Sequence, residues 1–190
     1  MENYKKNLKL LCKNYVYSSE MEHDACGVGL IASTEGKKSR AVVEYGIEAL
    51  KAVWHRGAVD ADGKTGDGAG IHVEIPKDFF IEKIEVTGHD YDNSEICVGM
   101  IFLPRNDYSS QESCKTIVES ELTKNDFSIY GWRQVPVNPK ILGEKAFQTM
   151  PEIIQVLFKS NDPNVLDKDL ERKIYETRKK IENKAFDLSL

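Results

Sequence analysis

The chain has 190 residues, of which 41% are hydrophobic and 30% are charged, a balance typical of a soluble globular domain. Its net charge of −5 provides no basic patch, which excludes nucleic acid and an anionic membrane surface as partners. No segment approaches the roughly 20 apolar residues of a membrane span. The four cysteines show no metal-pair spacing, which predicts free thiols in a reducing cytoplasm and no metal site.

In the first half of the chain, hydrophobic periodicity predicts one helix between two short strands. Residues 1–25 are polar and show little periodicity. The apolar run 26–33 predicts a buried strand, and the i, i+3/i+4, i+7 spacing over 39–54 predicts an amphipathic helix. A loop rich in glycine and aspartate follows at 55–70. An alternating strand at 71–75 comes next, with a short helical turn directly after it.

The second half mixes strand and helix patterns. Apolar runs and helical spacing predict, in chain order, a strand at 96–103, a helix at 109–124, strands at 127–137 and 153–159, and a helix at 166–185. A strand-like alternation begins again at 186–190. This order predicts an α+β protein, because it lacks the strict alternation of a doubly wound parallel sheet.

Three familiar glycine motifs can be excluded in the loop 55–70. A P-loop fails because Ala58 occupies the position of its first glycine. A calcium loop that starts at Asp60 fails because its twelfth position is Ile71 and not glutamate. A dinucleotide-binding loop fails because these glycines precede a strand and do not join a strand to a helix. Taken alone, the loop is best interpreted as a close approach of backbone to backbone that glycine permits.

Cys26 is the candidate nucleophile among the four cysteines. The simpler interpretation is a small buried hydrophobic residue at the start of a strand. Three features favour a reactive thiol instead. The segment Gly27-Val-Gly29 leaves room for a substrate to approach the sulfur, and the polar 25 residues before Cys26 could be removed. A His55-Arg-Gly-Ala58 loop also lies downstream, after one helix.

Three segments carry a resemblance to a known family: Cys26-Gly-Val-Gly-Leu-Ile-Ala32, His55-Arg-Gly-Ala58 and Thr65-Gly-Asp-Gly-Ala-Gly-Ile71. In this order and spacing they resemble the start of the glutamate synthase large subunits, which begin with a class II glutamine amidotransferase domain. The resemblance covers about 22–190 and includes later segments such as Gly131-Trp-Arg-Gln-Val-Pro136. The Cys-Gly pair alone is weak evidence, whereas the two downstream motifs with these spacings are specific.

The resemblance implies an N-terminal-nucleophile hydrolase fold, a four-layer αββα sandwich of two antiparallel sheets between helices. It implies a pro-segment at 1–25 and the N-terminal part of a glutaminase domain at 26–190. The family's later His-x-Arg-Phe/Tyr and Asn-Gly motifs do not occur in these 190 residues. We therefore expect a domain truncated on its C-terminal side, and we expect the 190-residue chain alone to be inactive.

The resemblance also implies that Cys26 is the catalytic residue that hydrolyses L-glutamine to glutamate and ammonia. Removal of 1–25 would give Cys26 a free α-amine, whose pKa of about 7.7–8.0 suits it to take the thiol proton. The thiolate then attacks the side-chain amide, ammonia leaves, and water hydrolyses the thioester.

Six further residues are implied as support for the substrate site: Gly27, His55, Arg56, Gly57, Asp67 and Gly68. For His55 and Arg56 we favour a structural role in the loop over direct contact with the substrate.

No cofactor is expected in this chain. For the full-length enzyme the resemblance implies FMN and an iron–sulfur cluster, a downstream synthase domain that uses the ammonia to convert 2-oxoglutarate to glutamate, and a small reductase subunit as a further partner. Two alternatives stay open. The chain could be a truncated, non-catalytic binding or regulatory module, or a separate amidotransferase subunit of another synthase.

Overall fold

The computed structural model describes residues 6–7, 9–10, 12–13, 27–53, 57–66, 68–165 and 167–189. The chain divides into two compact units, Met1–Gly57 and Ala58–Leu190. Across these described ranges, no helix combines the length and the apolar character needed to cross a lipid bilayer.

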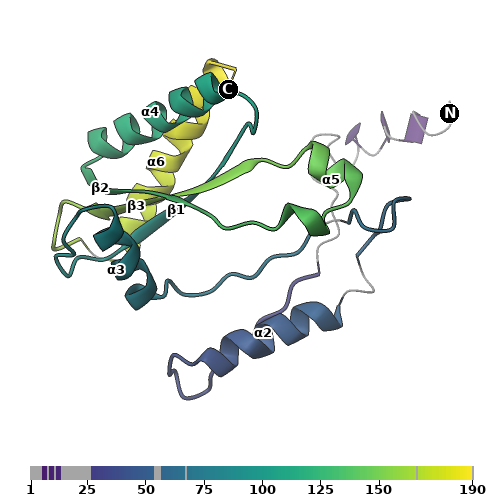
Figure 1. The fold of residues 1–190 in the computed structure, drawn as a ribbon, viewed down its shortest axis with the longest axis horizontal. Coiled ribbons are helices and arrows are strands. Elements are labelled where there is room, and N and C mark those ends of the chain that lie inside the picture. The colour runs from purple at the N-terminus through teal and green to yellow at the C-terminus, as the bar shows by residue number, and fades with distance from the viewer. Residues whose placement is uncertain are drawn as a thin grey trace. The chain divides into compact units, whose positions relative to one another are not determined.

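The first unit contains helix α2, Arg40–Ala52, which confirms the helix predicted at 39–54 (Figure 1). Its N-terminus is capped by the side chain of Ser39, which accepts a hydrogen bond from the backbone N–H of Ala41 at 3.2 Å. Lys51 lies in the last turn, where a positive charge is favourable to the helix dipole.

Two predicted strands are absent from the described residues. The segments 27–33 and 71–75 have no strand structure, so both predictions are wrong for the residues described. Val28 and Leu30 are 92% and 89% exposed. An apolar or alternating run becomes a strand only beside a partner that completes its hydrogen-bond ladder, and among the described residues neither segment is part of a β-ladder. The apolar pattern of each segment predicts that it tends to be buried, but the pattern does not specify the strand with which the segment would pair.

The second unit contains one three-stranded antiparallel sheet in the order β1-β3-β2. The strands are β1 Cys97–Leu103, β2 Phe127–Gln134 and β3 Glu152–Ser160, which confirms three of the predicted strands. Strand β2 ends three residues earlier than expected, because Pro136 has no N–H to donate to a ladder. β3 is the central strand, and its residues 154–158 are all buried.

Helices precede, separate and follow the strands. They are α3 Lys77–Val86, α4 Tyr108–Lys124, the 3₁₀ turn η2 Pro139–Ile141, α5 Glu144–Gln148 and α6 Asp167–Asp187. The helices predicted at 109–124 and 166–185 are confirmed, although Leu166 lies outside the described residues. The strand-like alternation at 186–190 is wrong, because α6 continues to Asp187 and residues 188–189 form a turn. The sequence did not predict η2 or α5.

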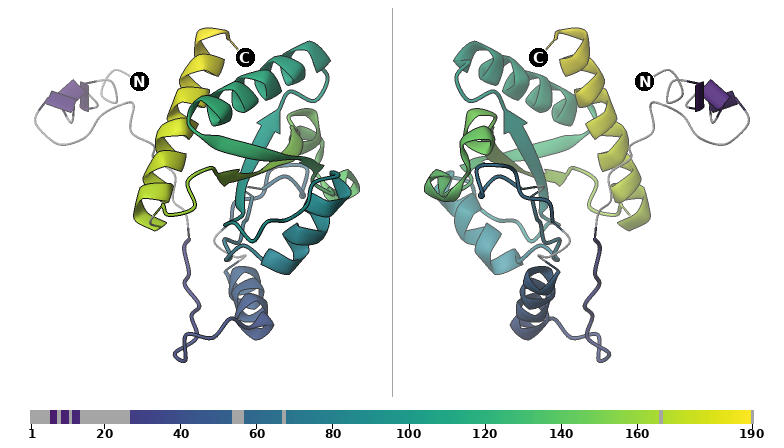
Figure 2. Two further views of the ribbon diagram at one scale, coloured as in Figure 1. Left: turned by 90° about the vertical axis from the view of Figure 1, so that its left-hand side faces the viewer. Right: turned by 90° about the vertical axis from the view of Figure 1, so that its right-hand side faces the viewer.

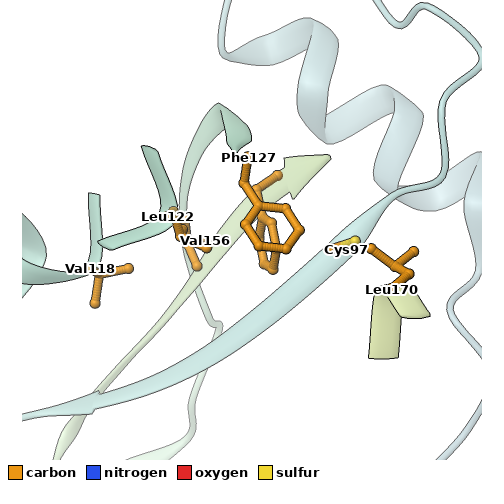
Figure 3. Packing of buried hydrophobic residues seen from close by; sticks show 7 residues of the cluster. Cys97, Val118, Leu122, Phe127, Val156 and Leu170 are labelled. Atoms are coloured by element: carbon orange, nitrogen blue, oxygen red, sulfur yellow. The ribbon is translucent and has the colours of Figure 1, made fainter. Parts of the chain in front are cut away.

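Helices cover the sheet on both faces, as Figure 2 shows. On one face, α4 and α6 enclose a core that takes its residues from both helices and all three strands (Figure 3): Cys97, Val118, Leu122, Phe127, Val156, Phe158 and Leu170. On the opposite face, α3 packs on Tyr130 and Leu157 through Phe80 and Ile84. Leu157 and Ile84 are fully buried, and each such side chain contributes about 1.5–3 kcal/mol to folding.

The α3 face of the sheet is only partly covered. Strand β1 turns Val98, Met100 and Phe102 to this face, because side chains alternate along a strand. Val98 packs against the α3 core, but Met100 and Phe102 are 50% and 63% exposed. The described residues thus form a helix–sheet–helix arrangement with an apolar strip left open. They confirm an α+β fold with an antiparallel sheet. The four-layer αββα sandwich that the sequence resemblance implies has two such sheets, and the described residues contain one of them.

Candidate active site

The seven residues that the sequence assigns to the site are only partly described. Four lie outside the described residues: Cys26, His55, Arg56 and Asp67. The other three, Gly27, Gly57 and Gly68, are exposed; Gly27 and Gly57 belong to the first unit and Gly68 to the second. The roles of all seven therefore stay predictions.

A small closed hairpin, residues 58–66, lies in the chain between the two predicted site loops. Val59 and Gly66 form an antiparallel bridge across its base. Next to the bridge, the backbone N–H of Asp60 donates to the carbonyl oxygen of Thr65 at 2.8 Å. These contacts confirm the close backbone approach that was inferred from the glycine-rich sequence, and they make the loop an ordered element.

Asp62 organises the tip of this hairpin. Its Oδ1 accepts hydrogen bonds from the backbone N–H groups of Lys64 at 2.9 Å and Thr65 at 2.7 Å. Its Oδ2 accepts the Thr65 hydroxyl at 2.6 Å and the backbone N–H of Glu144 at 3.0 Å. These hydrogen bonds, that from the Thr65 side chain first, hold the pKa of the Asp62 carboxyl well below its usual range. Asp62 is thus an ionised acceptor for donors on the hairpin and on α5.

Gly143, directly before α5, allows this contact to form. A Cβ at Gly143 would overlap both the Thr65 hydroxyl and the Asp62 carboxylate, so no larger residue fits without displacing the hairpin. The φ of Gly143 is −71°, so space rather than backbone conformation requires glycine here. A second link joins Lys145 Nζ to Asp60 Oδ2 at 2.5 Å. The hairpin is therefore fastened to the chain segment 143–145.

Both ends of the hairpin continue directly into predicted site residues. Ala58 follows Gly57 in the chain, and Gly68 lies two residues beyond Gly66. Gly68 has a φ of +82°, a backbone conformation that glycine adopts far more readily than other residues. The hairpin is therefore adjacent in the chain to both glycine-containing loops.

The described cysteines are poor candidates for a nucleophile. Cys97 is buried in the core beneath α4 and α6, and its burial raises the pKa of the thiol to about 12. Burial also raises the pKa of the Cys114 thiol. Because the thiolate is the nucleophilic form, neither thiol is activated near neutral pH. Cys12, Cys97 and Cys114 are all free, in agreement with their interpretation as ordinary thiols.

A separate hollow of about 250 Å³ lies where β1 and β3 meet the start of α4. Its lining mixes the charges of Arg105, Lys115 and Glu152, and it includes no cysteine, histidine or serine. It therefore lacks the thiol that the predicted thioester chemistry requires. Among the residues that the structure describes, no group of three or more His, Cys, Asp or Glu is placed to hold a metal ion.

Comparison with known families identifies the class of protein. The sequence profile of the family described as glutamine amidotransferases, class II, matches residues 26–189. The chain therefore belongs to the class II glutamine amidotransferases, an enzyme class that the sequence motifs had predicted. Neither the non-catalytic module nor the separate subunit of another synthase is better supported by this match.

Three similar proteins have names that agree with the predicted family. The chain is 52% identical over 180 residues to the glutamate synthase [NADPH] large chain of Azospirillum brasilense, covering 95% of this chain and 12% of that protein. It is 42% identical over 162 residues to ferredoxin-dependent glutamate synthase 1 of Arabidopsis thaliana, covering 85% of this chain and 10% of the relative. With the ferredoxin-dependent glutamate synthase of Pyropia yezoensis it shares 39% identity over 176 residues, 92% and 11% of the two chains. The chain thus spans about a tenth of the length of these relatives.

Sequence reasoning missed the roles of Asp62 and Gly143. In the sequence, Asp62 is only the third position of the excluded calcium loop that starts at Asp60, whereas in the structure both of its oxygens accept hydrogen bonds within the protein. The local signal for a turn was present in Asp62-Gly63, since Gly63 has a φ of +68°. The partner residue Glu144 lies 82 positions away, so no local pattern could indicate it.

Proposed function

We propose that this chain provides the N-terminal part of the glutaminase domain of a glutamate synthase, with Cys26 as its nucleophile. One observation carries the proposal: the match to the class II amidotransferase family begins at residue 26. A match that starts at the cysteine supports a functional domain whose first residue is Cys26. It also supports residues 1–25 as a pro-segment that lies outside this domain.

Hydrolysis of glutamine then follows from the chemistry of an N-terminal cysteine. Once the bond between Ala25 and Cys26 is cleaved, the free α-amine takes the proton of the thiol near neutral pH. The sulfur forms a bond to the side-chain amide carbon of L-glutamine, and the carbon–nitrogen bond breaks with release of ammonia after the nitrogen receives that proton. Water attacks the thioester, which releases glutamate and restores the thiol. In this scheme Gly27, His55, Arg56, Gly57, Asp67 and Gly68 support the substrate site, with His55 and Arg56 in a structural role.

The ammonia would be used by a downstream synthase domain that converts 2-oxoglutarate to glutamate. The similar proteins are named as glutamate synthases dependent on NADPH or on ferredoxin, which supports this partner domain and an external electron donor. FMN, an iron–sulfur cluster and a small reductase subunit would belong to that longer protein. In the part of this chain that the structure describes, no group of three or more His, Cys, Asp or Glu could hold the cluster.

The uncovered strip on the sheet supports a four-layer sandwich for the complete domain. Met100 and Phe102 are half exposed or more, on the face opposite to α4 and α6. A second antiparallel sheet placed against this face would bury both side chains, with α4 and α6 forming the outer helical layer. We also place the protein in the cytoplasm, which the free thiols of Cys12, Cys97 and Cys114 support.

The proposed nucleophile can be tested in the full-length protein that contains this chain. Cys26→Ala should abolish glutamate release from glutamine, while synthesis of glutamate from added ammonia and 2-oxoglutarate continues. Cys114→Ala is the matched control, because this half-buried thiol lies on α4 and is not activated; its glutamine hydrolysis should equal that of the wild type. Undiminished glutamine hydrolysis by Cys26→Ala would remove Cys26 from the mechanism.

A further inference from the structure

We propose that Asp62 is a positioning residue for the glutaminase: it locks the hairpin 58–66 onto the segment 143–145 and thereby fixes the loop that contains Gly68. The inference rests on the proposed function, because the role of Gly68 at the substrate site comes from it. Asp62 itself needs no contact with glutamine. Gly68 follows the hairpin by two positions in the chain, so a displaced hairpin would displace Gly68 as well.

The geometry separates two tasks between the two oxygens of Asp62. Oδ1 serves the hairpin alone, through the N–H groups of Lys64 and Thr65. Oδ2 receives the N–H of Glu144 from outside the hairpin, together with the Thr65 hydroxyl. The carboxylate thus shapes the turn with one oxygen and fastens it to α5 with the other.

This division makes the two tasks separable by mutation. In Asp62→Asn, the amide oxygen can keep the two hydrogen bonds that Oδ1 accepts. The NH₂ group then takes the place of Oδ2, and it cannot accept a hydrogen bond from the Glu144 N–H because both groups are donors. The Thr65 hydroxyl can turn and accept from that NH₂ group. Asp62→Asn should therefore preserve the hairpin and break its link to α5. Since the side chain of Asp62 is exposed, the change should leave global stability nearly unaltered.

Gly143→Ala breaks the same link from the opposite side. Its Cβ would overlap the Thr65 hydroxyl and the Asp62 carboxylate, and it would push the hairpin away from α5. If the two residues act through one contact, the double variant should be no worse than the more impaired single variant. Lys145→Gln is the control on the same segment. It removes only the exposed ion pair to Asp60, a class of contact that contributes little, and it should change activity less than about twofold.

The experiment measures glutamine-dependent and ammonia-dependent glutamate synthesis by the full-length protein, together with its Tm. In Asp62→Asn and in Gly143→Ala we expect kcat/KM for glutamine to fall about 10- to 100-fold, mainly through a higher KM, because misplacing a substrate-binding loop by about 1 Å has effects of this size. Ammonia-dependent synthesis and Tm should match the wild type.

Three results would overturn the inference. They are a kcat/KM within twofold of the wild type in either variant, equal losses of glutamine- and ammonia-dependent synthesis, and a lowered Tm that parallels the loss of activity. The variant Cys26→Ala, measured beside them, keeps the two claims apart. If Cys26→Ala loses glutamine hydrolysis while Asp62→Asn keeps it, only the positioning role of Asp62 fails. If Cys26→Ala stays active, the proposed function itself fails.

Discussion

The carboxylate of Glu121 on α4 accepts a hydrogen bond from Lys184 on α6, although the glutamate side chain is only 5% exposed. Lys124 lies 3.4 Å from the same oxygen, and Asn125 donates to the Glu121 backbone carbonyl at 2.7 Å. This buried carboxylate joins the two helices that cover one face of the sheet. The hydrogen bond from Lys184 is the main cause that lowers the pKa of Glu121 below its ordinary value.

Glu121→Gln should loosen the contact between α4 and α6. A buried group that loses a charged partner costs about 1–3 kcal/mol, so amide hydrogen exchange in the two helices should become roughly 5- to 150-fold faster. The measurement is hydrogen–deuterium exchange followed by mass spectrometry. Glu112→Gln is the control on the same helix. Its carboxylate pairs with Lys115 while 73% exposed, so exchange there should hardly change. Equal effects of the two substitutions would contradict a special role for Glu121.

The same carboxylate should make the α4–α6 contact sensitive to acid. Because the folded-state pKa of Glu121 is lowered, its stabilising contribution is complete above the ordinary glutamate pKa of about 4.3 and is lost as the pH falls through the folded-state value. Exchange in α6 should therefore accelerate below about pH 4, after correction for the intrinsic pH dependence of exchange. In Glu121→Gln this acceleration should be smaller. Identical acid profiles in the two proteins would show that other carboxylates dominate.

Phe102 tests the sandwich proposed for the complete domain. If a second sheet covers the strip formed by Met100 and Phe102, Phe102→Ala should destabilise the full-length protein by about 3–5 kcal/mol, as for other buried phenylalanines. Tyr175→Ala is the control, because this ring is 55% exposed and lies on α6, which covers the opposite face of the sheet. Its substitution should cost less than about 1 kcal/mol. Thermal unfolding provides the comparison, and equal shifts in Tm would argue against a covering sheet.

Thiol reactivity distinguishes Cys26 from the buried cysteine of the core. At pH 8 a small alkylating reagent should modify Cys26 first and abolish glutamine hydrolysis in parallel, and glutamine should slow the reaction. Cys97 should react only after unfolding, because burial both shields it and raises the pKa of its thiol to about 12. Peptide mass mapping at partial modification would decide. Inactivation that follows modification of Cys97 or Cys114 would contradict this order.

The sequence predicted the helices and strands of residues 97–187 better than the segments 27–33 and 71–75, because periodicity reports burial. The helices α4 and α6 and the strands β1 and β3 repeat their apolar residues at the expected spacing, and the structure buries these residues together. The segments 27–33 and 71–75 also have strand patterns, but among the described residues they form no β-ladder. Pairing between distant segments is a property of the whole fold, and periodicity does not contain it.

The candidate site likewise combines local features, which the sequence can indicate, with long-range contacts, which it cannot. The motif around Cys26 is local, so the sequence could indicate a nucleophile, although Cys26 itself lies outside the described residues. The support that Asp62 receives from Glu144 is long-range, and it became visible only in three dimensions. Gly143 illustrates the same limit. Its φ of −71° suits any residue, and only the neighbouring Thr65 and Asp62 explain why a side chain is excluded.

The most direct test of the central claim is the mass of the amino-terminal peptide of the purified, active full-length protein. If the α-amine of Cys26 is the base that activates its own thiol, the active chain must begin at Cys26, and residues 1–25 must be absent from it. We therefore expect a single amino-terminal peptide that starts with Cys26-Gly-Val-Gly, in proportion to glutaminase activity. A fully active protein that still carries Met1 would contradict the mechanism.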